Sequence, residues 1–461
     1  MVNQNPRSPA DLPTIVGRLR HWAEKQPEAP AFVWLADGEV EEARLSFGEL
    51  DRAASRVAAR LVEAGAVGEC ALLLFPPGLD FVAAFLGCLR ARTVAVPSYP
   101  PRPRRQQPRL RAMAADCRPR FVLTDASLSR RREELRESVP ELAEAIWLEL
   151  PPLGELVAEE APVRKARWEG PEPAPEDLAF LQYTSGSTSL PKGVMVLHRN
   201  LSHNQEMIRK AFGNDGTSVI LGWLPLFHDM GLIGNVLQPL WLGARCILMS
   251  PMAFLQRPLR WLEGIHRYRA TTSGGPNFAY DLCAQRIGEE ERAALDLSSW
   301  QVAFNGSEPV RAATLSRFAE TFAPCGFDPA AAYPCYGLAE ATLFVTGAEA
   351  GGGFRSLAVS AAVLEKGRAE AETGDGARHL VSSGRIAEDL ELRLTDPETG
   401  AVRADGEVGE IQVRGASVAA GYWNRPEATA ATFQTSESGP WLATGDLGFA
   451  WNGELFVTGR I

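Results

Sequence analysis

The 461-residue sequence lacks the features of a secreted or membrane-spanning protein. Residues 1–13 contain no apolar core of the kind a signal peptide needs, and no later run approaches the roughly 20 apolar residues of a membrane span. The seven cysteines are odd in number, widely scattered and without a C-x-x-C pair, so we expect reduced, structural thiols. These absences predict a cytoplasmic protein with no membrane span.

Basic charge is also in deficit. The chain has 47 Lys and Arg against 57 Asp and Glu, a formal net charge of −10, and the acidity is spread along its length. Nothing therefore favours nucleic acid or an anionic membrane as a partner. The hydrophobic content of 45% and the length predict a globular protein with large cores and more than one domain.

Residues 180–199, FLQYTSGSTSLPKGVMVLHR, predict a strand, a polar loop and a second strand. Gly186 allows close backbone approach, the Thr and Ser hydroxyls donate hydrogen bonds, and Lys192 adds a movable positive charge, a combination that suits polyphosphate. The loop is not a Walker A motif, because a Leu-Pro pair precedes Lys192 and a glycine follows it. An ordinary Ser/Thr/Gly-rich connection is the alternative for the loop alone.

Strand-like and helical patterns alternate through the first two thirds of the chain. The apolar run 70–75 predicts a strand, Asp80 is expected to cap the following helix, and residues 93–96 predict the next strand. This βαβ order predicts parallel sheets. Further strands are expected at 120–124, 145–150, 219–223, 246–249 and 301–304, and helices at 12–26, 43–61, 201–212, 232–243 and 259–268.

The pattern of strand-like and helical segments changes along the chain and predicts three subdomains. Residues 1–175 and 176–352 are each expected to form an α/β subdomain with a mostly parallel sheet, the second carrying the polar loop. The Glu- and Pro-rich stretch 159–177 marks the boundary between them. Residues 353–461, with short strands and Gly-containing turns, predict a smaller β-barrel-like subdomain.

Several phrases in order resemble those of the adenylate-forming superfamily, which includes acyl-CoA ligases, peptide-synthetase adenylation domains and fatty acyl-AMP ligases. They are the polar loop, LPLFHDMGLIG, TSGGPNFAYDL, NGSEPV, YPCYGLAEATLFVT and TGD. Ser189 stands where most of the superfamily has glycine, and fatty acyl-AMP ligases also depart from glycine at this position. Residues 354–384 resemble the insertion that marks those ligases and is thought to disfavour attack by coenzyme A, although an ordinary surface hairpin is the alternative.

The resemblance implies a nucleotide site. The phosphates would be held by Thr184, Ser185, Gly186, Ser187, Thr188 and Lys192. The adenine side would be formed by Gly306, Ser307, Glu308, Tyr336, Gly337 and Leu338, with Tyr336 stacked on the base. Asp446 would accept hydrogen bonds from the ribose hydroxyls, and Arg460 would reach the ribose or a phosphate.

Catalytic roles are implied for Lys192, His228 and Glu340. His228 follows a predicted strand and would lie at the junction of the acyl carboxylate and the α-phosphate, unless it is a satisfied structural histidine. Glu340, with Thr184, would bind Mg²⁺, which needs few protein ligands beside ATP phosphates; a helix-starting glutamate is the alternative. The acyl pocket would be lined by Gly274, Gly275, Phe278 and Tyr280, with plain core packing as the alternative for the two aromatic residues.

The implied reaction is ATP-dependent activation of a fatty acid to an acyl-adenylate, with release of pyrophosphate. The acyl group would pass to an acyl carrier protein or a polyketide or peptide synthase assembly. An acyl-CoA ligase and a non-catalytic module that binds ATP or acyl chains are the alternatives. The Pro- and Arg-rich stretch 97–111 is interpreted either as a solvated connection or as a carrier-protein docking surface.

Family members continue past the position of Arg460 into a small C-terminal lid that carries a further catalytic lysine. The resemblance therefore implies that these 461 residues correspond to the large N-terminal domain. Without the lid, this form is expected to bind ATP but to adenylate slowly.

Overall fold

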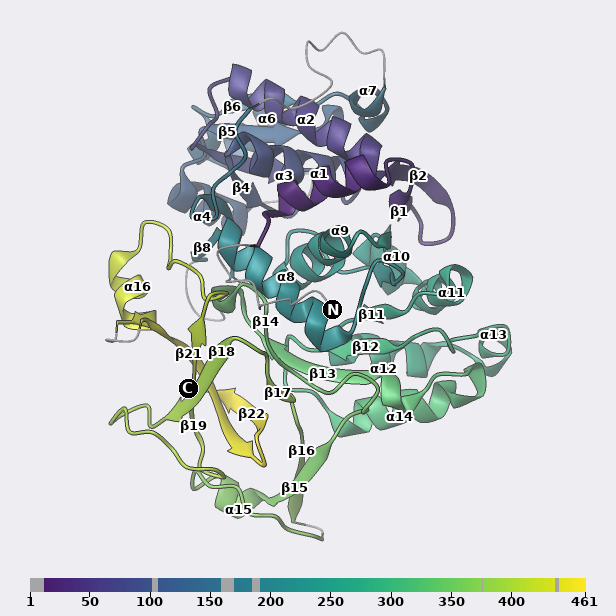
Figure 1. The fold of residues 1–461 in the computed structure, drawn as a ribbon, viewed down its shortest axis with the longest axis vertical. Helices are drawn as coiled ribbons and strands as arrows, with labels where there is room; N and C mark the ends of the chain where they lie inside the picture. The colour runs from purple at the N-terminus through teal and green to yellow at the C-terminus, as the bar shows by residue number, and fades with distance from the viewer. Residues whose placement is uncertain (1–11, 102–106, 159–169, 185–190, 375, 436–438) are drawn as a thin grey trace, which may run out of the picture. The chain divides into compact units, whose positions relative to one another are not determined.

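The computed structural model describes residues 12–101, 107–158, 170–184, 191–374, 376–435 and 439–461. The chain forms two compact units (Figure 1). Unit 1 comprises Met1–Gln205, Trp223–Pro251 and Ala419–Pro426, and unit 2 comprises Glu206–Gly222, Met252–Val418 and Glu427–Ile461. The predicted three-part division stays a prediction; its third part, 353–461, contributes Ala419–Pro426 to unit 1.

A six-stranded sheet is the main scaffold of unit 1. Its strand order is β6 (Ile146–Glu149), β5 (Phe121–Thr124), β3 (Cys70–Leu74), β4 (Val94–Pro97), β7 (Leu178–Tyr183) and β8 (Gly193–Leu197). Neighbours from β6 to β7 pair in parallel, and only the β7–β8 pair is antiparallel. The predicted parallel α/β sheet is confirmed.

Helices of unit 1 connect and cover these strands. They are α1 (Ile15–Lys25), α2 (Phe47–Glu63), α3 (Leu79–Ala91), α4 (Pro108–Cys117), α5 (Ala126–Ser129), α6 (Arg132–Ser138), η2 (Pro140–Leu142) and α7 (Leu153–Val157), followed by α8 (His198–Phe212), which ends in unit 2. One predicted boundary was wrong: the helix expected from residue 43 starts at Phe47. Ser46 accepts from the backbone N–H of Glu49, whose carboxylate accepts from Ser46 N–H, and this capping box sets the start.

Asp80 does not cap α3, contrary to the sequence prediction. The N-cap is Gly78, in an extended conformation, and no side chain caps this helix. Asp80 lies instead in the first turn, where a carboxylate still interacts favourably with the helix dipole.

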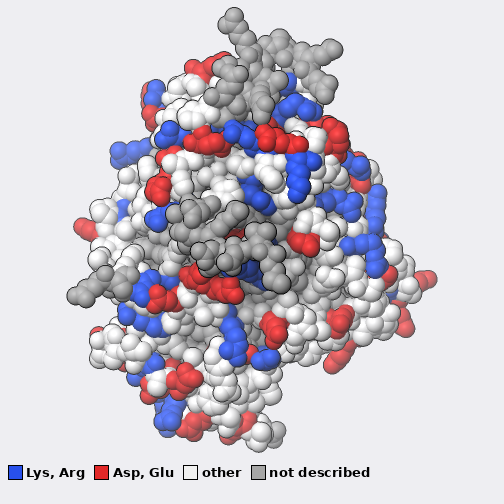
Figure 2. All heavy atoms as spheres, in the orientation of Figure 1, with Lys and Arg blue, Asp and Glu red and all other residues white. Residues whose placement is uncertain are grey.

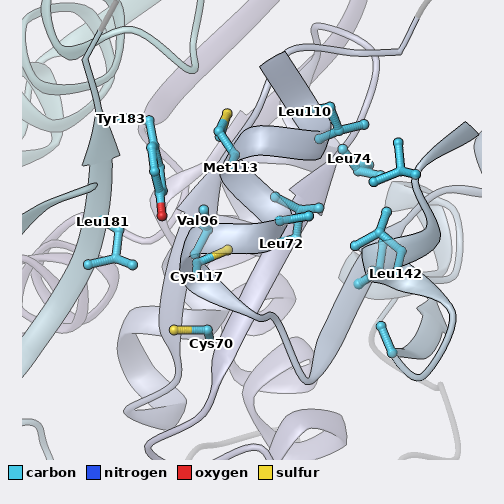
Figure 3. Close-up of a cluster of buried hydrophobic side chains, with 14 of the residues drawn as sticks. Cys70, Leu72, Leu74, Val96, Leu110, Met113, Cys117, Leu142, Leu181 and Tyr183 are labelled. Atoms are coloured by element: carbon cyan, nitrogen blue, oxygen red, sulfur yellow. The ribbon is translucent and has the colours of Figure 1, made fainter. Parts of the chain in front are cut away.

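Apolar side chains from α4 and one face of the six-stranded sheet form a hydrophobic core in unit 1 (Figure 3). Leu72 and Val96 extend from β3 and β4, and Leu110 and Met113 meet them from α4. Tyr183, the last residue of β7, lies at the border of this core. Burial of this layer orients the end of β7, from which the polar loop departs.

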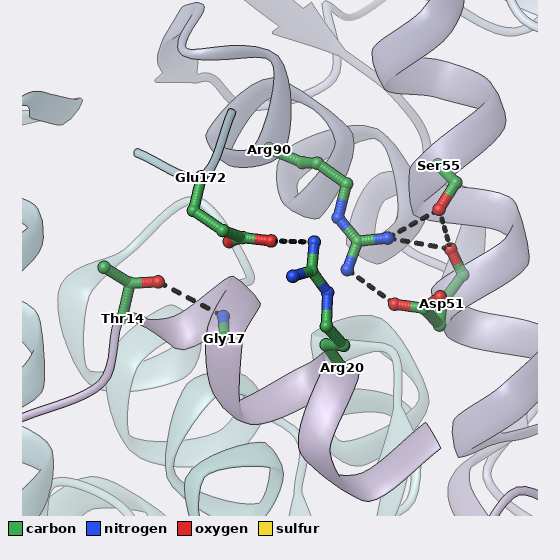
Figure 4. Close-up of polar contacts among 7 residues, drawn as sticks. All are labelled: Thr14, Gly17, Arg20, Asp51, Ser55, Arg90 and Glu172. Atoms are coloured by element: carbon green, nitrogen blue, oxygen red, sulfur yellow. Dashed lines mark hydrogen bonds and ion pairs between the residues drawn. The ribbon is translucent and has the colours of Figure 1, made fainter. Parts of the chain in front are cut away.

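A buried arginine links two helices of unit 1 (Figure 4). Arg90 of α3 is 1% exposed, and its guanidinium donates to Asp51 Oδ1 at 2.5 Å and to Ser55 Oγ at 2.6 Å, both on α2. Arg20 of α1 pairs with Glu172 in the same region. The Asp51 carboxylate compensates the buried charge, and the two terminal nitrogens of Arg90 are hydrogen-bonded.

Unit 1 also contains β10 (Arg245–Met249), β1 (Pro30–Leu35) and β2 (Glu41–Ser46), paired in that order. The single helix predicted over 232–243 is two elements: a π-helix, η3 (Met230–Leu237), and α9 (Gln238–Leu242). Pro239 has no N–H to donate and lies in the first turn of α9, where this loss is tolerated. Gly231 is required by close approach, since a Cβ there would overlap the Pro225 carbonyl oxygen.

The α/β part of unit 2 is a mixed sheet. Its strand order is β17 (Arg385–Ile386), β14 (Phe344–Gly347), β13 (Ala332–Gly337), β12 (Val302–Asn305), β11 (Thr272–Gly274) and β9 (Val219–Gly222), with parallel pairing from β13 to β9. Its helices are α10 (Pro251–Gln256), α11 (Leu259–Tyr268), α12 (Asn277–Arg286), α13 (Glu289–Arg292), α14 (Ala312–Phe322), η4 (Ala323–Cys325), η5 (Pro329–Ala331) and η6 (Ala339–Ala341).

The remainder of unit 2 is β-rich, as predicted. One curled antiparallel sheet contains β18 (Leu390–Thr395), β19 (Gly409–Gly415), β21 (Trp441–Trp451), β20 (Phe433–Gln434) and β22 (Glu454–Arg460), and a second pairs β15 (Ser356–Ser360) with β16 (Ala377–Val381). The short helices α15 (Ala361–Leu364) and α16 (Pro426–Thr432) flank them.

Charges of both signs are interspersed over the face drawn in Figure 2. Among the described residues, no helix combines the length and apolarity needed to cross a bilayer.

Candidate active site

The polar loop is closed at its stem by an antiparallel strand pair in unit 1. Tyr183 at the end of β7 faces Gly193 at the start of β8, and the backbone N–H of Thr184 donates to the Lys192 carbonyl at 3.2 Å. The two predicted strands are confirmed as β7 and β8. Ser185, Gly186, Ser187 and Thr188 lie outside the described residues.

Tyr183 also connects the stem to α4. A Cβ at position 193 would lie 2.9 Å from Cζ of Tyr183, so this glycine makes room for the ring. The Tyr183 hydroxyl donates to Asp116 Oδ2 at 2.8 Å, and Arg425 Nε donates to Asp116 Oδ1 at 2.9 Å. Burial, followed by the nearby Cys117 and Asp116, raises the pKa of Tyr183, so it remains a neutral donor.

Lys192 lies over an aromatic ring that the sequence analysis did not identify. Its Nζ is 4.7 Å from the ring centroid of Tyr422, and Tyr422 is buried. A lysine in this position is held by the ring quadrupole while its positive charge is retained.

His228 is placed at the turn after Pro225. Gln182 of β7 fixes the preceding residue, because its Nε2 donates to the Phe227 carbonyl at 3.1 Å. The His228 Nδ1 is 2.6 Å from Asp229 Oδ1, and the Asp229 charge raises the pKa of His228 despite partial desolvation. With 49% of its side chain exposed, His228 is not an enclosed core histidine and can meet a ligand.

In unit 2, three residues implied in nucleotide binding come together from two sheets, Tyr336 from β13 and Asp446 and Arg460 from the paired strands β21 and β22. Asp446 of β21 accepts from the Tyr336 hydroxyl at 2.8 Å and from Arg460 Nε at 2.9 Å. Asp446 and Arg460 face each other in the β21–β22 register. Burial and then Asp446 raise the pKa of Tyr336, and the hydrogen bond to Asp446 raises the pKa of Arg460.

Glu340 lies on the short turn η6 that follows β13. The Glu340 charge also contributes to the raised pKa of Arg460, so the two side chains are electrostatically coupled. The turn is narrow: a Cβ at Gly337 would overlap the Leu343 carbonyl oxygen. Thr342 has φ of +71°, and its hydroxyl donates to the Ser417 carbonyl at 2.6 Å, which holds the turn in place.

The predicted Gly306–Ser307–Glu308 phrase follows β12, next to β13 in the parallel sheet. Because parallel strands end at the same edge, this phrase and Tyr336–Leu338 share one side of unit 2. A Cβ at Gly306 would lie 3.1 Å from the Cys335 carbonyl oxygen, and Ser307 has φ of +73°. Both observations indicate a backbone shaped for close approach.

The residues implied in the acyl pocket have different environments. Tyr280 is 1% exposed, donates its hydroxyl to the Phe304 carbonyl at 2.8 Å and contacts Trp261 and Trp300, so plain core packing describes it. Phe278, at the start of α12, is 46% exposed and is not a core residue. Gly274 ends β11 and Gly275 follows it; a Cβ at Gly274 would overlap the Phe304 carbonyl, which accepts from Gly275 N–H. Their acyl-binding role stays a prediction.

The segment 354–384 forms a hairpin that packs on β21 and β22. Val359, Leu364 and Leu380 share a hydrophobic cluster with Phe449 and Phe456. The link continues in the backbone, where Ser383 N–H donates to the Leu455 carbonyl and Leu455 N–H to the Gly384 carbonyl. The hairpin is therefore fastened to the strands that carry Asp446 and Arg460.

The sequence analysis found most of the polar groups but not their supports. Asp116, Tyr422 and Arg425 were missed because each contacts a residue distant in the sequence. Asp229 was missed although it directly follows His228. Thr184, Lys192 and His228 belong to unit 1, and Glu340, Asp446 and Arg460 to unit 2. Within the described ranges, no group of three or more His, Cys, Asp or Glu side chains could hold a metal ion.

Comparison with known proteins places this chain in a family. Residues 19–423 match the family model "AMP-binding enzyme". The chain is 43% identical over 466 residues to the medium-chain-fatty-acid–[acyl-carrier-protein] ligase JamA of Moorena producens, covering 98% of this chain and 78% of that protein. It is 38% identical to the corresponding ligase TtuA of Teredinibacter turnerae, covering 98% and 77%. The chain therefore belongs to the AMP-binding enzyme family.

The fold agrees with this assignment. A fatty acyl-adenylate ligase from L. pneumophila, solved with acyl adenylate and pyrophosphate, is similar with a TM-score of 0.89 and 41% identity, covering 97% of this chain and 77% of that one. The resemblance to adenylate-forming enzymes, and among them to fatty acyl-AMP ligases, is confirmed.

Proposed function

We propose that the protein activates a fatty acid with ATP to form an acyl-adenylate and pyrophosphate, and passes the acyl group to an acyl carrier protein. The observation that carries the proposal is the Tyr336–Asp446–Arg460 arrangement, coupled to Glu340. A carboxylate accepts from ribose hydroxyls, and an aromatic face suits adenine. The activities for which JamA, TtuA and the L. pneumophila ligase are named support the acyl half of the reaction.

In this proposal, each residue neutralises or positions the reactants. Thr184 and Lys192 hold phosphate oxygens together with Ser185, Gly186, Ser187 and Thr188, while His228 meets the reacting carboxylate and α-phosphate. Gly306, Ser307, Glu308, Gly337 and Leu338 shape the adenine side. Phe278, with Gly274 and Gly275, borders the acyl chain, while Tyr280 packs in the core.

Glu340 of unit 2 and Thr184 of unit 1 are each donors of the kind that Mg²⁺ prefers. Glu340 offers a partly exposed carboxylate on a fixed turn, and Thr184 offers a hydroxyl. These hard oxygen donors, completed by ATP phosphates and water, suit the ion, which would offset phosphate charge. A cytoplasmic location remains a prediction from the sequence.

Pyrophosphate release with ATP and a panel of fatty acids tests the function. Medium chains come first, since JamA and TtuA are both named as medium-chain ligases. Parallel reactions with coenzyme A and with a phosphopantetheinylated carrier protein separate the acceptors. We expect acyl-AMP to accumulate, the carrier protein to accept the acyl group and coenzyme A to accept it poorly.

Two outcomes would overturn parts of this proposal. Efficient acyl-CoA formation would favour the acyl-CoA ligase alternative. A 38% identical relative from Mycobacterium tuberculosis, fadD25, is named as a putative fatty-acid–CoA ligase. ATP binding without pyrophosphate release for any acid would indicate a non-catalytic module.

A further inference from the structure

The segment Ala419–Pro426 extends the sheet of unit 1 beside β8. Met195 N–H donates to the Gly421 carbonyl at 2.9 Å, and Trp423 N–H donates to the Gly193 carbonyl at 2.8 Å. Between these two bonds, Val194 pairs with Tyr422 in an antiparallel bridge. A segment more than 200 residues later in the chain thus borders the stem of the polar loop.

This register explains why Tyr422 meets Lys192. Residues opposite each other in an antiparallel pair project to the same face, and so do alternate residues along one strand. Lys192 is two residues before Val194, so it is the diagonal neighbour of Tyr422, a separation that a long side chain and an aromatic ring can bridge. The observed 4.7 Å from Nζ to the ring centroid agrees with this geometry.

Polar contacts hold the segment in that register. Asn424 has φ of +52°, a left-handed conformation that asparagine tolerates, and Arg425 N–H donates to the Tyr422 carbonyl at 3.3 Å. The turn brings Arg425 to Asp116, which is 4% exposed and also accepts from Tyr183. Asp116 therefore links Tyr183, at the end of β7, to Arg425, near the end of the segment.

We propose that Tyr422 is a positioning residue for Lys192, holding its ammonium group ready for the ATP phosphates without neutralising it. This inference rests on the proposed function and on the phosphate-binding role of Lys192. A lysine stem has about 2 kcal/mol of rotamer entropy to lose on binding, and a ring that restricts it beforehand lowers that loss. A carboxylate in the place of the Tyr422 ring would compensate the positive charge of Lys192. Among the described residues, no ion pair joins Lys192 to a carboxylate.

The test measures ATP affinity by calorimetry, together with KM for ATP and for the fatty acid, in the 461-residue protein. Tyr422→Phe keeps the ring and should bind ATP like the wild type. Tyr422→Leu should weaken ATP binding about fivefold and raise the KM for ATP, with little change in the KM for the fatty acid. In a Lys192→Met background, Tyr422→Leu should have no further effect on ATP affinity, because the group it positions is gone.

A second series avoids dependence on the fold of the leucine variant. Phenylalanine and trifluorophenylalanine at position 422 have similar shapes, but fluorination weakens the ring quadrupole, so ATP affinity should fall with fluorination. An undiminished effect of Tyr422→Leu in the Lys192→Met background, or equal affinity across the fluorinated series, would overturn the inference. Absence of pyrophosphate release by the wild type would instead refute the proposed function, and ATP affinity would still decide the role of Tyr422.

Discussion

Replacing Asp116 with alanine is expected to destabilise unit 1 by about 2–3 kcal/mol, an amount worked from its contacts. Tyr183 is 5% exposed, and losing the acceptor of its hydroxyl leaves a buried donor unsatisfied, which costs about 1–3 kcal/mol. Arg425 is 38% exposed, so water replaces much of the lost ion pair, and this part contributes at most about 1 kcal/mol. The buried phenol therefore dominates the effect.

Guanidinium unfolding of matched variants measures this loss of stability. Tyr183→Phe alone should lose about 1 kcal/mol, and the double variant with Asp116→Ala should be no less stable than Asp116→Ala alone, because no donor is left unpaired. Glu137→Ala, at an exposed position of α6, serves as the control and should stay within about 0.5 kcal/mol of the wild type. Additive losses in the double variant, or a loss at Asp116 no larger than at Glu137, would refute the reasoning.

Three further predictions concern the chemistry of the site. Asp229→Asn should move the NMR titration of His228 to lower pH, because the Asp229 charge raises the pKa of His228. In the wild type, this raised pKa stabilises the folded state fully below about pH 6.5, and the stabilisation is lost as pH rises through the pKa of the folded state. His228→Ala and Glu340→Ala should each reduce acyl-adenylate formation at least about tenfold with unchanged thermal unfolding, and near-normal rates would mean a misplaced site. Burial raises the pKa of Cys335 to about 12, so iodoacetamide at pH 8 should label it only after denaturation, as peptide mass spectrometry can show.

The alternation of apolar runs and helical patterns was sufficient to predict the α/β fold and most strands to within one or two residues. β3 is an example: its short, wholly apolar sequence has few ways to be buried other than in a covered parallel sheet. Boundaries set by local hydrogen bonds were less accessible. The capping box at Ser46 and the extended Gly78 before α3 determined helix starts that periodicity placed elsewhere.

The site divides in the same way. Motif phrases were enough to name His228, Glu340 and Asp446, because a ligand that needs given polar groups constrains short stretches of sequence directly. The partners of those groups were decided by tertiary structure: the strand register that sets Tyr422 beside Lys192 joins segments more than 200 residues apart. Local sequence contains no record of which distant strand will pair at a sheet edge, since that choice depends on burying both segments together. The sequence thus determined which chemical groups are present, and the packing of distant strands determined how they are held.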